Sequence, residues 1–143
     1  MPRLIADTSG LLAGMAAGHA AHHAVRDVLT AAEDRPVVSP LVLAELDYLL
    51  STRLGARGSL QAIDALTAGA YEIPVIDERD LTAARPMLAK YADANIGLTD
   101  AINVVLADRY GTDLVLTLDE RHFRIIRPLS DCHAAFRLLP TDR

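Results

Sequence analysis

The chain has 143 residues, 51% of them hydrophobic and 23% charged, which is enough apolar material for one folded domain and argues against a disordered segment. A single cysteine excludes an intramolecular disulfide and a zinc site built from cysteines, and no apolar run approaches the roughly 20 residues of a membrane span. The N-terminal residues lack a signal-peptide pattern, so we expect a cytoplasmic protein, and the net charge of −5 gives no preference for nucleic acid.

Short apolar runs alternate with amphipathic segments along the chain. The runs predict strands at residues 4–6, 35–38, 71–75, 113–117 and 136–139. The segments between them predict helices near residues 8–15, 19–32, 39–54, 59–66, 77–91 and 99–110, with a turn at residues 55–59. Strands that alternate with helices favour a mainly parallel sheet covered on both faces. We therefore expect a single α/β domain over residues 1–143, a three-layer α/β/α sandwich with four or five strands.

Capping residues stand at several of the predicted helix starts. Ser39, directly before a proline, combines a capping hydroxyl with a proline in the first turn. Thr8 or Ser9 can cap the first helix, and Thr99 can cap the helix that ends near residue 110.

Four carboxylates lie where an open α/β sheet brings distant residues together. Asp7 and Asp119 follow the first and fourth predicted strands. Asp100 opens a helix, whose dipole is expected to lower the pKa of this carboxyl, and Glu45 lies about one and a half turns into another helix. Because ligands of parallel sheets bind beyond the carboxyl ends of the strands, we expect the four side chains to converge.

The apolar surroundings of Asp7, Glu45 and Asp119 predict that these carboxylates are partly buried. Clustered acids cannot all stay ionised in a partly dry cleft without cations, and the only basic side chain directly beside them is Arg121. Mg²⁺ binds oxygen ligands and keeps several waters, whereas Zn²⁺ prefers histidine or cysteine. The sequence therefore predicts a site for a magnesium-like ion.

Four motifs carry a resemblance to a known family. They are Asp7-Thr8-Ser9, Ser39 with Glu45, Thr99-Asp100-Ala101 and the segment from Thr117 to Phe123. In this order they resemble PIN-domain proteins and, more closely, the VapC toxins of bacterial toxin–antitoxin pairs, over residues 4 to about 139. The resemblance implies an endoribonuclease that depends on Mg²⁺ or Mn²⁺, cleaves RNA of the tRNA or rRNA class, is held inactive by a cognate antitoxin and usually forms a homodimer.

The resemblance also implies roles for single residues. It assigns the metal ligands to the acidic cluster of Asp7, Asp100, Glu45 and Asp119. Neighbouring hydroxyls would orient these carboxylates by hydrogen bonds, namely Thr8, Ser9 and Thr117. Glu120 or Asp93 could share the role of Asp119. Bound cations would activate a water and stabilise the leaving oxygen, so no histidine base is expected beside the acids.

Other polar residues have weaker functional interpretations. Arg121 and His122 are candidates for contact with RNA because they stand beside Asp119. Further basic residues could line an RNA path, namely Arg79, Arg85, Lys90, Arg124 and Arg127. Three histidines share the spacing of one helical face and could bind a metal, although a polar helix start is the simpler interpretation: His19, His22 and His23.

Three other functions compete with a nuclease. A phospho-receiver signalling domain needs a lysine after a late strand, but the only lysine lies inside a predicted helix. A phosphatase of the haloacid dehalogenase type needs a second aspartate two residues after the first, where this chain has Ser9. A catalytically silent PIN fold that only binds protein or RNA is the third alternative, and the filled acidic positions argue against it.

Overall fold

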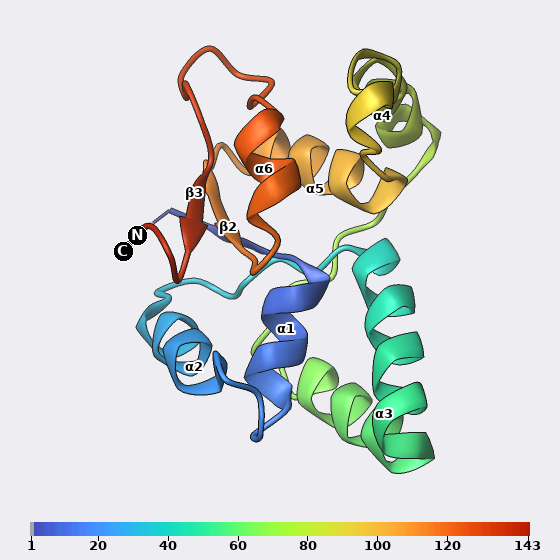
Figure 1. Ribbon diagram of the computed structural model, residues 1–143, viewed down its shortest axis with the longest axis vertical. Helices are drawn as coiled ribbons and strands as arrows, with labels where there is room; N and C mark the ends of the chain where they lie inside the picture. Colours follow the sequence, from blue (N-terminus) through green and yellow to red (C-terminus); the bar gives the residue numbers. More distant parts are fainter. Residues whose placement is uncertain (1) are drawn as a thin grey trace.

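A parallel sheet forms the centre of the computed structural model, which describes residues 2–143 (Figure 1). In this part of the chain the sheet has three regular strands in the order β1 (Leu4–Ala6), β2 (Leu114–Leu116) and β3 (Arg137–Leu139). The helices are α1 (Thr8–Met15), α2 (His22–Ala31), α3 (Pro40–Thr67), α4 (Glu78–Lys90), α5 (Leu98–Arg109) and α6 (Glu120–Ile125), with a short 3-10 turn, η1 (Ala92–Ala94). None of the helices within residues 2–143 has the length and apolar character needed to cross a membrane.

The regular strands predicted at residues 35–38 and 71–75 are wrong. Each segment pairs through one residue only, since Val37 bridges to Ile5 of β1 and Glu72 bridges to Val37, both in parallel. One proline lies directly before Val37, at position 36, and another lies two residues after Glu72, at position 74, and proline has no N–H to donate to a ladder. The two segments therefore extend the sheet past β1 without becoming strands.

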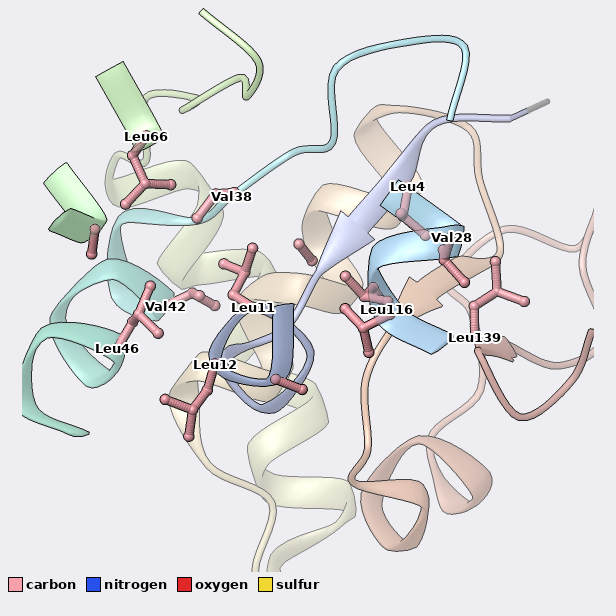
Figure 2. Close-up of a cluster of buried hydrophobic side chains, with 14 of the residues drawn as sticks. Leu4, Leu11, Leu12, Val28, Val38, Val42, Leu46, Leu66, Leu116 and Leu139 are labelled. Carbon is pink, nitrogen blue, oxygen red and sulfur yellow. The ribbon is translucent and has the colours of Figure 1, made fainter. Parts of the chain in front are cut away.

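Alternating side chains of the strands divide the core into two clusters. Leu4, Leu116 and Leu139 belong to a cluster with residues of α1, α2 and α3, as Figure 2 shows. Ile5 and Val115 belong to a second cluster with residues of α4, α5 and α6. Because successive residues of a strand point to opposite faces, this division is the pattern of a sheet covered on both sides. The predicted three-layer α/β/α architecture is confirmed.

The predicted turn at residues 55–59 appears as a kink inside α3. Gly55 has φ = 68°, a left-handed conformation that costs little only for glycine, and helical conformation resumes on its far side. The two helices predicted here are therefore present on either side of the kink. The six-residue α6 was not among the predicted helices, because it is too short to show a periodic pattern.

Two of the three predicted capping sites do not act as caps. The Ser39 hydroxyl accepts a hydrogen bond from the Leu41 amide at 3.1 Å, as predicted for the start of α3. Helix α1 instead follows Asp7, and α5 follows Gly97, in both cases without a capping side-chain hydrogen bond. The hydroxyls of Thr8, Ser9 and Thr99 are therefore available for other partners.

Candidate active site

An open cleft of about 920 Å³ lies at the carboxyl ends of β1 and β2. All four predicted carboxylates line it, each from a different part of the chain: Asp7, Glu45, Asp100 and Asp119. Two of them, Asp7 and Asp119, follow neighbouring parallel strands, so the rule for parallel sheets correctly predicted their meeting place. Of the two residues that could share the fourth acidic role, Glu120 lines the cleft and Asp93 is not part of its lining.

Asp7 is the most buried of these carboxylates, with 6% of its surface exposed. Its Oδ1 accepts a hydrogen bond from the Asn103 amide at 3.1 Å, and its Oδ2 accepts one from the Thr117 hydroxyl at 2.9 Å. Burial raises the pKa of Asp7 to about 6, and the negative charges of Asp100 and Glu45 add to this shift while the Thr117 hydrogen bond opposes it. Keeping Asp7 ionised therefore lowers the stability of the folded protein.

A close approach between α1 and β2 fixes the position of Asp7. The Asp7 amide donates a hydrogen bond to the Leu116 carbonyl at 2.9 Å. Gly10, one turn into α1, packs so tightly that a Cβ atom there would lie 2.6 Å from the Leu116 carbonyl oxygen. Only glycine therefore lets the start of α1 rest on the end of β2, with Asp7 between them.

Glu45 lines the cleft but is exposed, so the prediction that it is partly buried is wrong. Its carboxylate is nevertheless held by two hydroxyls, since Thr8 donates to Oε2 at 3.0 Å and Thr99 donates to Oε1. The hydroxyls expected to cap α1 and α5 thus orient a side chain of α3. This network joins three helices at one wall of the cleft.

Asp100 and Asp119 share one imidazole. The His122 Nδ1 atom lies 2.8 Å from Asp100 Oδ2 and 3.4 Å from Asp119 Oδ2. Burial raises the pKa of Asp100, an effect that His122 opposes, so the lowered pKa predicted from the helix dipole is wrong. A histidine thus lies in contact with two of the four acids. Asp119 Oδ1 is buried and has no hydrogen-bond partner within the described residues.

A chain of hydroxyls leads from β2 to Asp7. The Ser9 hydroxyl accepts a hydrogen bond from the Leu118 amide at 2.9 Å and lies 3.2 Å from the Thr117 hydroxyl. The Thr117 hydroxyl in turn accepts from the Asp119 amide at 3.0 Å and donates to Asp7. Each hydroxyl has one proton, so this order of donors fixes the direction of the chain toward the Asp7 carboxylate.

Few of the basic residues considered from the sequence line the cleft. Arg121 and His122 do, and so does Arg53 of α3, which the sequence did not point out. Arg79 and Arg124 form ion pairs with aspartates outside the cleft, and the remaining candidates are not part of its lining: Arg85, Lys90 and Arg127.

The three histidines near the start of α2 do not form a metal site. His19 lines the cleft and its Nδ1 accepts a hydrogen bond from the Ala21 amide at 3.1 Å. His22 instead contacts the Ala13 carbonyl oxygen through its Nδ1, at 2.8 Å.

Asn103 is the second site residue that sequence reasoning missed, and its only signal was a polar side chain three residues after Asp100 in an apolar helix.

The oxygen atoms in the cleft fit a hard divalent cation. No group of three or more Asp, Glu, His or Cys side chains within residues 2–143 forms a ready-made cage for an ion. Mg²⁺ does not require one, because it usually binds through one or two carboxylates and keeps several waters. Asp7, Asp100 and Asp119 supply carboxylate oxygens, and the buried Asp119 Oδ1 lacks the partner that a cation or its water would provide.

Comparisons with known proteins agree on one family. Residues 4–127 match the model of the PIN domain. Ribonuclease VapC26 of Mycobacterium tuberculosis is 45% identical over 126 residues, which cover 88% of this chain and 93% of that protein. The crystal structure of the sarcin–ricin loop-cleaving toxin VapC20 of Mycobacterium tuberculosis superimposes with a TM-score of 0.75 and 20% identity, covering 82% of this chain and 90% of that chain. At this low identity the second match speaks for the fold alone.

Proposed function

The chain belongs to the PIN-domain family, with a VapC ribonuclease among its relatives, and on that premise we propose that it is a divalent-metal-dependent endoribonuclease and the toxin of a bacterial toxin–antitoxin pair. The observation that carries this proposal is the common cleft of four carboxylates from distant segments. Nothing in the packing of the core requires an acid at Asp7, whose burial opposes its ionised form. A bound cation is the partner that would offset this cost.

We assign the cation to Asp7 and Asp100, with Glu45 and Asp119 completing the acidic cluster, and we propose Mg²⁺, with Mn²⁺ as a substitute. When bound, such an ion supplies Lewis-acid stabilisation of the phosphodiester and lowers the pKa of water. The residues themselves prepare the site. Thr117 and Asn103 hold Asp7, while the Thr8 and Thr99 hydroxyls hold Glu45.

Contacts with the RNA backbone are assigned to the basic side chains at the cleft. Arg121 lines it and forms no ion pair within residues 2–143, which leaves its guanidinium available for a phosphate. His122 lies between Asp100 and Asp119, close to the place where the scissile phosphate would bind. The substrate is proposed to be RNA of the tRNA or rRNA class.

Apolar side chains exposed on α3 support the proposal that this chain binds partner proteins. Tyr48, Leu54, Leu60 and Ile63 are 54–69% exposed there. All four belong to α3, and exposed apolar surface on a helix is available for contact with another protein. We propose that the chain binds a cognate antitoxin and forms a homodimer, as the family resemblance implies.

Cleavage of purified RNA tests the proposal. The protein should cut RNA with Mg²⁺ or Mn²⁺, and EDTA should stop the reaction. Asp100→Asn should abolish cleavage. The control is Asp113→Asn, because the Asp113 side chain is equally exposed, at 14%, but pairs with Arg137 outside the cleft. This control should retain cleavage. Absence of cleavage with either metal would contradict the nuclease and favour a PIN fold that only binds protein or RNA.

A further inference from the structure

Asn103 is a polar residue in the most buried stretch of α5. Its side chain is fully buried, as are those of its neighbours Ile102 and Val104. Its amide nitrogen donates to Asp7 Oδ1 at 3.1 Å, but its own Oδ1 is buried without a partner in the part of the chain that the structure describes. A buried carbonyl oxygen without a hydrogen bond is unfavourable. Packing alone would therefore favour an apolar side chain at this position.

The place of Asn103 in α5 connects it to two predicted metal ligands. It lies three residues after Asp100, so both residues stand on the same side of the helix. Its hydrogen bond reaches across 96 positions of sequence to Asp7, which follows β1. Thr117, at the end of β2, holds the other oxygen of the same carboxylate. The two donors thus approach Asp7 from two different elements, and together they fix its carboxylate in a single orientation.

Resting on the metal-dependent function proposed above, we propose that Asn103 is a positioning residue, which holds the Asp7 carboxylate in the orientation that binds a divalent cation. The hydrogen bond occupies one lone pair of Oδ1 and leaves the other available to the ion. Without the amide, the carboxylate can rotate about its Cβ–Cγ bond, and the ion loses a ligand that was fixed before binding. Partners that orient a metal ligand in this way typically contribute about 10- to 100-fold to metal affinity.

Two variants separate this role from a contribution to folding. Asn103→Leu has a similar size and neither donates nor accepts hydrogen bonds, and Asn103→Ala serves as a second variant if the leucine does not fit. The control is Thr112→Val, because Thr112 is also buried and hydrogen bonded, to Arg3 and Leu114 at the starts of β1 and β2, away from the cleft. Mn²⁺ binding is measured by calorimetry, cleavage is measured over a range of Mg²⁺ concentrations, and unfolding is measured in EDTA.

We expect the Asn103 variants to bind Mn²⁺ about 10- to 100-fold more weakly and to cleave RNA slowly at low Mg²⁺. Excess Mg²⁺ should restore part of the rate, with an unchanged KM for RNA, since a weakened site is refilled by mass action. Thr112→Val should lower the unfolding temperature and leave Mn²⁺ affinity intact.

Two results would overturn the positioning role of Asn103. One is wild-type Mn²⁺ affinity in the variants, and the other is a loss of cleavage that follows the loss of stability and does not respond to Mg²⁺. A wild-type protein that binds no Mn²⁺ would instead overturn the proposed function, and this inference with it.

Discussion

Replacing Asp7 with asparagine should make the metal-free protein more stable while it abolishes cleavage. The folded-state pKa of Asp7 is about 6, against an ordinary value of 3.8, so the folded protein binds its proton more tightly than the unfolded chain does. As the pH rises through the window from about 4 to 6, the unfolded state loses this proton first, and stability falls. The shift corresponds to about 3 kcal/mol of destabilisation, fully present above pH 6.

Asparagine keeps the shape of the side chain and removes the charge. Its carbonyl oxygen can accept from Thr117, and its amide can donate to the unpartnered Asn103 Oδ1 once the Asn103 amide has flipped. Asp7→Asn should therefore gain up to about 3 kcal/mol near pH 7.5, or roughly 10 °C in unfolding temperature. The gain should shrink toward pH 4, where the wild-type carboxyl is neutral as well.

Thermal or urea unfolding in EDTA at several pH values measures this difference. Asp142→Asn is a control of opposite sign, because its hydrogen bond with Arg124 lowers the pKa of Asp142 to about 2 and makes its ionised form favourable. That variant should lose stability at neutral pH, and the loss should disappear only as the pH falls toward 2. Mg²⁺ should stabilise the wild type and leave Asp7→Asn unchanged. An Asp7→Asn variant that is no more stable near pH 7.5, or whose gain does not change with pH, would refute the reasoning.

Two further substitutions probe RNA binding and the construction of the cleft. Arg121→Ala should raise KM for RNA more than it lowers kcat, and it should reduce the slope of log affinity against log salt concentration by about one. Arg127→Ala, outside the cleft, should change neither KM nor this slope. An unchanged slope for Arg121→Ala would rule out a phosphate contact. Gly10→Ala should cost about 1–3 kcal/mol of stability, because its Cβ would lie 2.6 Å from the Leu116 carbonyl oxygen. In the control Gly18→Ala the added Cβ meets no atom within 4 Å, so this variant should be tolerated. Equal stability of the two variants in urea unfolding would show that α1 does not pack against the end of β2 at Gly10.

The layers of the fold could be predicted because they depend on periodic patterns. Strand β1 and the helices that cover the sheet follow from apolar spacing, and the parallel arrangement follows from their alternation. The strands at residues 35–38 and 71–75 failed because a strand needs a neighbour along its whole length. Val37 and Glu72 are the single residues through which these segments pair, and each has a proline one or two positions away. An apolar run shows β-propensity, and the number of ladder bonds depends on tertiary pairing.

The meeting of the four carboxylates could be predicted for a similar reason, but their ionisation could not. Strand ends and a helix start determine where Asp7, Asp119 and Asp100 emerge. The pKa of Asp100 depends in addition on how much protein covers the side chain, and this burial outweighs the helix dipole that the sequence suggested. Glu45 shows the opposite error, because an apolar helix can still turn one side chain to solvent.

The hydroxyls show why local rules fail at this site in particular. Thr8 and Thr99 stand at helix starts, where a hydroxyl normally caps its own helix, yet both donate to Glu45 of α3. A capping hydroxyl accepts a hydrogen bond from a backbone N–H of the first turn, and the residue placed to do so is the one before the helix, which is Asp7 for α1 and Gly97 for α5. The Thr8 and Thr99 protons are therefore free to be donated, and the Glu45 carboxylate, once the fold brings it within reach, is a strong acceptor for both. Local sequence preferences are thus overruled where charged groups converge, which is where functional sites are found.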